Sequence, residues 1–206
     1  MITPSPSTAT NATPRLIAFA PDRRLAAGTL AEVATGLRGH LETRPEERIL
    51  VFDAATSRPV ELDLSGSVDE VAARYRDRER QAKADAERPA PKRRGRPKLG
   101  VVGREVTLLP RHWRWLAAQP GGASVTLRKL VDQARRDGAG AEEQRRAQEA
   151  TYRFMLAMAG DRPGYEEALR ALYAGRRDDF VQTIDSWPGD VREHTLELAA
   201  PAFADK

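Results

Sequence analysis

Apolar residues recur with two different periods in the first eighty residues of the chain. Leu16–Phe19, Arg24–Ala27 and Arg48–Asp53 are short runs typical of strands, and Val60–Leu64 alternates apolar and polar positions. Helical spacing links the apolar positions that follow Thr29 and Ser67, two residues suited to capping a helix. Glu70 stands three residues after Ser67 and completes the pattern of a capping box.

These elements predict a small α+β domain over residues 14–80 with the order ββαββα. Residues 1–13 are rich in Ser, Thr, Pro and Ala and predict a disordered tail. The core of the domain is expected from the apolar residues on the strands and helices: Leu16, Phe19, Val33, Leu37, Ile49, Val51, Phe52, Leu62, Leu64 and Val71.

The pattern changes after Tyr75, where the second helix loses its apolar face. Residues 76–88 contain no large apolar residue, and residues 89–100 hold three prolines and two glycines. Proline and glycine in this density disfavour both helix and sheet. We therefore expect residues 81–103 to form a flexible linker.

A strand, a short helix and a second helix are predicted over residues 104–138. Arg104–Leu109 has a strand pattern, and Pro110 stands where the first residue of a helix tolerates proline best. Ser124 is expected to cap the second helix, and Gly138 and Gly140 are expected to end it. Its apolar positions follow helical spacing: Leu127, Leu130, Val131 and Ala134.

The remaining residues, 139–206, are predicted to be helical. A long helix is expected over Glu142–Ala159, another opens at Pro163, and a last one begins after Trp187-Pro188-Gly189, where Asp190 and Glu193 suggest a second capping box. The fold class is thus α+β, with a small N-terminal domain, an extended basic linker and a mostly helical C-terminal half that begins with one strand.

Composition excludes several kinds of chemistry. The chain has no cysteine and three histidines, His40, His112 and His194, which lie far apart in the sequence. Disulfides, a thiolate nucleophile and cysteine-based zinc sites are therefore excluded, and we expect neither a metal nor another cofactor. Nothing supplies a nucleophile for His194, which we expect to be exposed or to cap a helix, so the sequence predicts no enzyme.

The chain also lacks an apolar run long enough to span a membrane, and its first residues lack the basic and apolar parts of a signal peptide. We therefore expect a soluble, cytoplasmic protein with no membrane partner.

Positive charge is concentrated in one stretch. The whole chain carries a net charge of +4, but residues 88–114 hold nine basic residues and one acid, so that stretch carries +8 and the rest −4. A local excess of this kind favours one short contact with a polyanion over a broad basic face.

Arg94-Gly95-Arg96-Pro97 lies in the middle of the basic stretch and resembles the AT-hook, a short motif that binds the minor groove of DNA. A·T tracts narrow this groove and deepen its negative potential, which attracts inserted arginines. Glycine has no Cβ to collide with the groove walls. The resemblance implies that A·T-rich duplex DNA is the partner and that the contacting residues are Lys92, Arg93, Arg94, Gly95, Arg96, Pro97 and Lys98.

Residues 104–136 resemble the ribbon-helix-helix fold of bacterial repressors, in which the strands of two chains pair into a ribbon that enters the major groove. The resemblance implies a homodimer, and we add Arg104, Arg111 and Arg114 to the expected DNA contacts. The residues that face DNA in that family are polar, whereas here they are Val106 and Leu108. This strand is therefore better explained by burial, in a dimer ribbon or against the C-terminal helices.

The order of segments as a whole resembles an uncharacterised bacterial family known only as a domain of unknown function. The basic stretch and its resemblance to an AT-hook predict a non-enzymatic DNA-binding protein, either a transcriptional regulator or a nucleoid-associated protein. The alternative is a protein-interaction or scaffolding protein whose basic linker is only a solubilising hinge. Trp113 is expected in the core, and Trp115 is expected to pack on a neighbouring element rather than to stack on bases.

Overall fold

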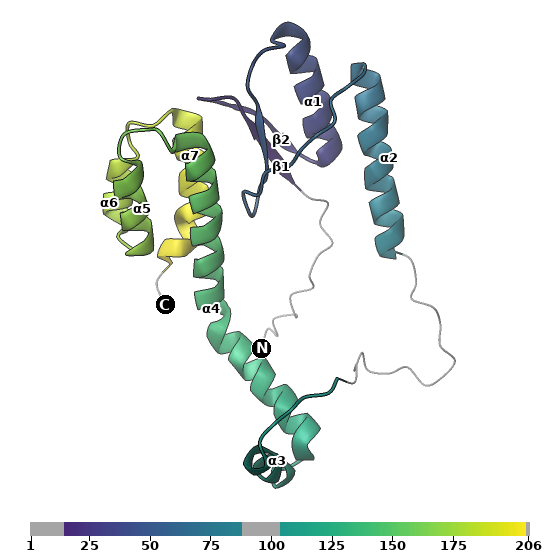
Figure 1. The fold of residues 1–206 in the computed structure, drawn as a ribbon, viewed down its shortest axis with the longest axis vertical. Coiled ribbons are helices and arrows are strands. Elements are labelled where there is room, and N and C mark those ends of the chain that lie inside the picture. Colours follow the sequence, from purple (N-terminus) through teal and green to yellow (C-terminus); the bar gives the residue numbers. More distant parts are fainter. Residues whose placement is uncertain (1–14, 88–103, 205–206) are drawn as a thin grey trace, which may run out of the picture. The chain divides into compact units, whose positions relative to one another are not determined.

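The computed structural model describes residues 15–87 and 104–204, which form two compact units (Figure 1). The first unit combines residues 15–87 with residues 143–204, and the second unit contains residues 104–142. The fold is α+β and mostly helical, with one three-stranded sheet among the described residues. This confirms the predicted class.

The sheet of the first unit is antiparallel and has the order β2-β1-β3. Strand β1 (Leu16–Phe19) lies in the centre, flanked by β2 (Arg24–Gly28) and β3 (Leu50–Asp53). The register places Phe19 opposite Leu50 on β3. All residues of β1 are buried, because neither face of this strand is open to solvent.

One face of the sheet is covered by α1 (Leu30–Thr43). Leu16 and Ala18 on β1 form a buried cluster with Val33 and Leu37 of this helix. The helix α2 (Val68–Glu87) packs against α1 rather than against the sheet. The contact between the two helices buries small and aromatic side chains: Ala31, Ala34, Val71 and Tyr75.

Both predicted helix starts in this region are confirmed. Thr29 Oγ1 accepts a hydrogen bond from the Glu32 amide at 3.3 Å, and the Glu32 carboxylate accepts from the Thr29 amide at 2.8 Å. Ser67 and Glu70 form the same reciprocal pair, at 3.3 and 2.7 Å. Each pair satisfies amide donors that the first helical turn leaves without a partner.

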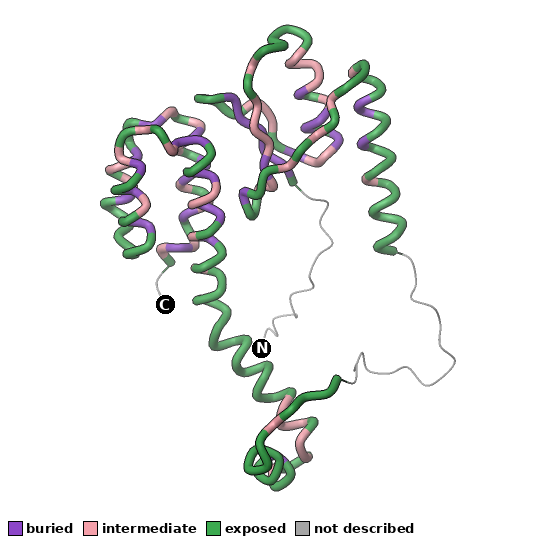
Figure 2. Tube along the Cα trace, in the orientation of Figure 1, coloured by how far each residue is buried: buried purple, intermediate pink, exposed green. Residues whose placement is uncertain are grey.

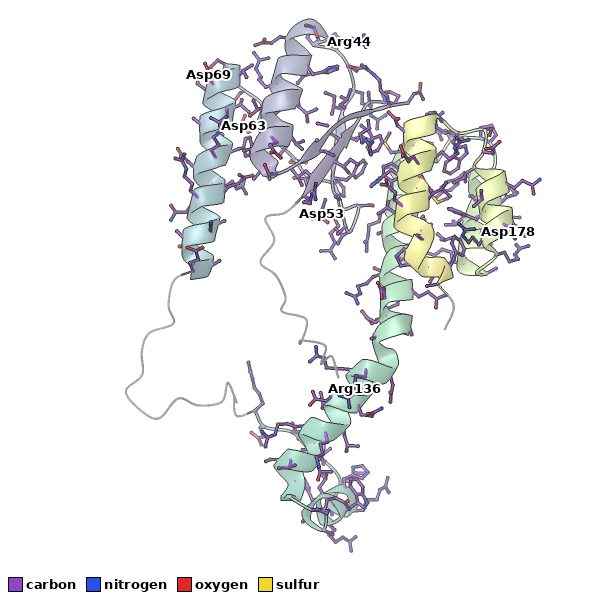
Figure 3. All side chains as sticks on the ribbon, turned by 180° about the vertical axis from the view of Figure 1, so that it is seen from behind. Arg44, Asp53, Asp63, Asp69, Arg136 and Asp178 are labelled. Atoms are coloured by element: carbon purple, nitrogen blue, oxygen red, sulfur yellow. The ribbon has the colours of Figure 1, made fainter. Side chains whose placement is uncertain are left out.

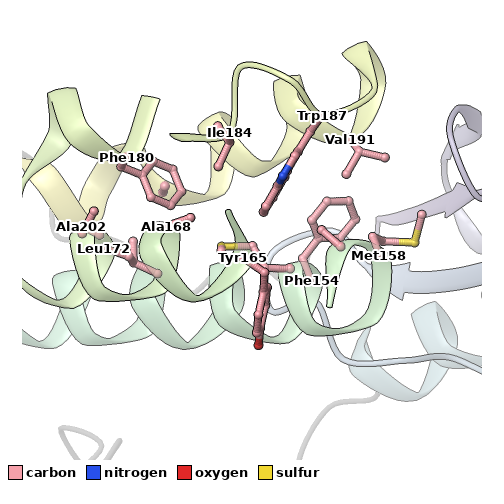
Figure 4. Close-up of a cluster of buried hydrophobic side chains, with 14 of the residues drawn as sticks. Phe154, Met158, Tyr165, Ala168, Leu172, Phe180, Ile184, Trp187, Val191 and Ala202 are labelled. Atoms are coloured by element: carbon pink, nitrogen blue, oxygen red, sulfur yellow. The ribbon is translucent and has the colours of Figure 1, made fainter. Parts of the chain in front are cut away.

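The other face of the sheet is covered by the C-terminal helices. These are the end of α4 (Gly122–Ala159), α5 (Tyr165–Tyr173), α6 (Arg177–Thr183) and α7 (Gly189–Ala199), followed by the 3₁₀ helix η1 (Ala200–Phe203). Figure 4 shows their buried side chains in a close-up.

Three residues of the sheet, Ile17, Phe19 and Phe52, belong to the same buried cluster as these helices. Phe154 of α4 is the centre of the contact, because its ring lies 5.0 Å from that of Phe19 and 5.6 Å from that of Phe52. The core of the first unit therefore depends on residues from both ends of the sequence.

The predicted strand over residues 60–64 is not formed. Past a single bridge between Phe52 and Pro59, the chain makes one further backbone hydrogen bond to β3, from the Val60 amide to the Val51 carbonyl. Leu62 and Leu64 are instead partly buried against the two helices. The alternating pattern is thus explained by packing on helices rather than by strand pairing, and the arrangement ββαββα is replaced by ββαβα.

Three other local predictions are wrong. Ser124 does not cap a helix, because α4 begins at Gly122 and already includes Ser124. Asp190 does not cap α7; its carboxylate accepts a hydrogen bond from the backbone amide of Arg24 at 2.7 Å, which ties the helix start to β2. Gly138 and Gly140 do not end a helix, since α4 continues through both. Glycine lowers helix stability but, unlike proline, removes no hydrogen bond.

The second unit contains α3 (Pro110–Ala117) and the first part of α4. Pro110 is the first residue of α3, as predicted. Residues 104–109, predicted as a strand, are assigned to no strand or helix. Leu116 is the one buried hydrophobic residue within residues 104–142, and α4 is exposed from residue 128 to residue 142 (Figure 2).

Candidate nucleic-acid interface

The predicted DNA-contacting residues divide into two groups. Residues 92–98, the AT-hook-like segment, lie outside the described part of the chain. Arg104, Arg111 and Arg114 belong to the second unit, and all three are exposed there. None of these three forms an ion pair within the described residues, so their charges are available to a partner.

Helix α3 presents both basic and aromatic side chains to solvent. Arg111 and Arg114 are three residues apart and therefore lie on the same side of the helix. Trp113 is 42% exposed and Trp115 is 52% exposed, so the prediction that both are packed is wrong for the chain alone. The reason is that Leu116 is the only side chain of α3 buried in this unit.

The first part of α4 is amphipathic, although residues 128–143 are all exposed. At 100° per residue, the apolar positions fall within a sector of about 100°. These positions are Leu127, Leu130, Val131 and Ala134. Leu130 and Val131 are 47% and 55% exposed. A stripe of this kind is normally covered by another surface.

The opposite side of this helix is basic. Arg128, Lys129, Arg135 and Arg136 lie within a sector of about 120°, centred roughly opposite the apolar stripe, with Asp132 among them. Figure 3 labels Arg136 on this part of α4. Two of these side chains are oriented by neighbours on the helix, because Arg128 donates to the Ser124 carbonyl at 3.0 Å and Arg136 to Gln133 at 2.8 Å.

The sequence-based prediction omitted these four basic residues, because it followed the local charge excess of residues 88–114, which ends before them. The pattern that identifies them is a pair of adjacent basic residues repeated after seven positions. Seven residues are nearly two helical turns, so both pairs share one face. The two pairs share a face only if residues 128–136 form one continuous helix.

The two units differ in net charge. Residues 89–142 contain twelve basic and four acidic residues, a net charge of +8. Because the whole chain carries +4, the remainder carries −4. The excess of positive charge thus belongs to residues 89–142 as a whole, a longer segment than the predicted basic stretch of residues 88–114.

The carboxylate of Asp63 in the first unit is occupied by internal contacts. Asp63 accepts hydrogen bonds from the hydroxyl and amide of Ser65 and lies 3.2 Å from Arg74 (Figure 3). The Ser65 hydroxyl and amide hold the pKa of the Asp63 carboxyl below its usual value. Within the described ranges, no group of three or more His, Asp or Glu residues is arranged to hold a metal ion.

His194 is buried, so the prediction that it is exposed or caps a helix is wrong. Its ring lies against Phe154 and Phe19, with ring centroids 4.7 and 5.6 Å away, because α7 belongs to the group of helices that packs on the face of the sheet opposite α1. The Nδ1 atom lies 3.1 Å from the Glu197 carboxylate, and the buried Nε2 atom has no hydrogen-bond partner. Ser57 Oγ is likewise buried and unpartnered, so the two do not form a nucleophile and base pair.

A family model described as an uncharacterized protein conserved in bacteria (DUF2239) matches residues 15–199. No curated protein and no solved structure matches the chain. Among the described helices, none has the length and apolar character needed to cross a membrane.

Proposed function

We propose that this chain, which belongs to the DUF2239 family of bacterial proteins, binds double-stranded DNA through residues 89–142 and has no enzymatic activity. The observation that carries the proposal is the separation of charge, +8 on this segment and −4 on the remainder. Phosphate contacts account for most of the non-specific affinity for DNA. The acidic remainder repels DNA, so affinity depends on the basic residues of this one segment.

Two kinds of contact follow from the residues of the segment. Arg94 and Arg96 enter the minor groove of A·T-rich DNA, where the narrow groove strengthens the attraction for arginine. The basic face of α4 and the arginines of α3 contact phosphates, which positions the protein without reading sequence. The role is that of a transcriptional regulator or a nucleoid-associated protein.

A second copy of the chain covers the apolar side of this segment. Six large apolar side chains are 42–55% exposed within it, far more than a stable unit of this size leaves open: Val106, Leu109, Trp113, Trp115, Leu130 and Val131. The backbone amides of residues 105–108 donate no backbone hydrogen bond within the described chain, so this stretch is free to pair with its own copy. Because the basic face of α4 lies opposite its apolar stripe, dimerisation leaves that face open to DNA.

Fluorescence anisotropy with labelled A·T-rich and G·C-rich duplexes tests DNA binding. We expect salt-dependent binding that is tighter to the A·T-rich duplex and strongly weakened in the double variant Arg94→Ala/Arg96→Ala. The matched control is Arg76→Ala/Arg78→Ala on α2, which removes two exposed arginines at the same spacing from the first unit. Equal affinities for the parent and the Arg94→Ala/Arg96→Ala variant would refute the minor-groove contact and favour the basic segment as a hinge in a scaffolding protein.

Light scattering coupled to size exclusion tests the dimer. We expect the parent to be a dimer at micromolar concentration and Leu130→Gln/Val131→Gln to be a monomer, since two charge-neutral polar groups replace the centre of the apolar stripe. Leu156→Gln is the control, because Leu156 is similarly exposed (53%) but belongs to the first unit. A parent that is strictly monomeric contradicts the dimer.

A further inference from the structure

A groove with a volume of about 650 Å³ opens on the surface of the first unit. Three segments line it: the end of β1 with the following turn, the residues that lead into β3, and the end of α4 with the residues that follow. The volume is within the range of small-molecule sites. All three segments belong to the same compact unit, so the groove does not depend on the DNA-binding segment.

The groove has an apolar floor. Phe19 and Met158 are buried, and Leu50 is partly buried beside them. Leu156 differs from the neighbouring apolar residues of α4, because it is 53% exposed whereas Met155 and Met158 are buried. An exposed leucine beside an apolar floor adds surface that a ligand can cover.

Arg162 is held in a fixed position at this groove. Its Nε atom donates to the Met158 carbonyl at 3.2 Å, and its Nη2 atom donates to the Pro21 carbonyl at 2.9 Å and to the Asp22 carboxylate at 2.5 Å. A guanidinium has five N–H donors, so these contacts leave others for a ligand.

Arg48 supplies a second guanidinium, and this one is free. It is exposed and forms no hydrogen bond or ion pair among the residues that the structure describes. The register of β1 and β3 pairs Phe19 with Leu50 at the end of the strand pair; Pro21 follows Phe19 by two residues, and Arg48 precedes Leu50 by two. Because the Pro21 carbonyl accepts from Arg162, both arginines lie at the same end of this strand pair.

We propose that this groove binds a carboxylate attached to an apolar body, of the size and chemistry of a medium-chain fatty acid. Arg48 pairs with the carboxylate, Arg162 supports it, and the apolar body lies on Leu50, Leu156 and Met158. Asp161 also lines the groove and has no ion-pair partner among the described residues. Its charge opposes a second negative charge on the ligand, which disfavours a phosphate dianion relative to a monoanion.

Isothermal titration calorimetry with octanoate, octanol and octyl phosphate, each kept below its aggregation concentration, tests the site on the full chain. We expect saturable binding of octanoate, at least about tenfold tighter than that of either other compound, since a charge-assisted pair contributes about one order of magnitude. Equal affinities for octanoate and octanol, tighter binding of octyl phosphate, or no saturable binding of octanoate would each overturn the proposal.

Variants locate the site. Arg48→Gln weakens octanoate binding about tenfold, and Leu156→Gln weakens it as well, with unchanged thermal unfolding because both side chains are exposed. The matched control is Arg58→Gln, an exposed arginine on the turn after β3 that does not line the groove. Octanoate affinity that is the same in Arg48→Gln and in the parent would show that the ligand binds elsewhere and would refute the assignment.

Discussion

Replacement of His194 by phenylalanine is expected to stabilise the first unit and to remove part of its dependence on pH. His194 is 4% exposed, packs against the rings of Phe19 and Phe154, and has one ring nitrogen without a partner. Burial lowers the pKa of His194, although the hydrogen bond and charge of Glu197 act in the opposite direction. Phenylalanine fits the aromatic surroundings and leaves no polar atom unsatisfied.

The magnitude follows from two opposing contributions at pH 7.5. A buried polar group without a partner costs about 1–3 kcal/mol, and loss of the contact with the exposed Glu197 removes about 0.5–1.5 kcal/mol. The net gain from His194→Phe is therefore about 1 kcal/mol in the free energy of unfolding.

The pH dependence has a definite sign. Because the pKa of His194 is lower in the folded state, the unfolded chain binds more protons, and stability falls as the pH drops from about 6.5 towards the folded-state pKa. At pH 5.5, one unit below the unfolded pKa, the parent has lost up to about 1.4 kcal/mol through this group. His194→Phe does not undergo this loss, so its advantage grows as the pH falls, to at most about 2.4 kcal/mol at pH 5.5.

Urea unfolding at pH 7.5, 6.5 and 5.5, followed by tryptophan fluorescence, measures both effects. Trp187 is buried in the first unit, whereas Trp113 and Trp115 are exposed, so the fluorescence change reports mainly on the first unit. His112→Phe is the control, because His112 is exposed in the second unit and its replacement leaves the transition unchanged. Parallel pH profiles for the parent and His194→Phe would refute the reasoning.

Two further substitutions test the fold. Gly138→Ala/Gly140→Ala adds methyl groups that meet nothing within 4 Å, so it should stabilise α4 by about 1 kcal/mol per glycine. The helical signal in circular dichroism should rise. No gain in helicity would indicate that the helix is broken at these glycines. Phe154→Ala removes the ring that joins the sheet to the C-terminal helices and should destabilise the first unit by about 3–5 kcal/mol in urea unfolding; a loss below 1 kcal/mol would contradict the shared core.

Local patterns predicted those parts of the fold whose causes are local. The caps at Thr29 and Ser67 need only residues within three positions, and both form as predicted. The strand predicted over Val60–Leu64 does not form. An alternating pattern shows that one side of a segment is buried, but it does not show whether that side pairs into a sheet or packs on a helix. The position of His194 depends on Phe19, 175 residues away in the sequence, and no local pattern contains that contact.

The candidate interface was predictable to a similar extent. Arg104, Arg111 and Arg114 are exposed in the structure, and they belong to residues 88–114, whose charge excess a sequence gives directly. The paired basic residues on α4 lie inside the helix predicted between Ser124 and Gly138, but they were missed because the prediction followed the charge excess of residues 88–114, which ends before them. Charge can be counted along a chain, but which charges share a face depends on how far each helix continues.

The arrangement of the first unit determines how the proposed functions have to be tested. Ile17, Phe19 and Phe52 are covered by helical residues that follow position 143. A fragment that ends at residue 88 would expose these side chains, and a fragment that begins at residue 143 would expose Phe154 and Met158 from the other side. Burial of one such side chain contributes about 1.5–3 kcal/mol, and several are lost together. Truncation would therefore remove the core along with the segment of interest, and the basic segment and the groove are best separated by substitutions in the full chain.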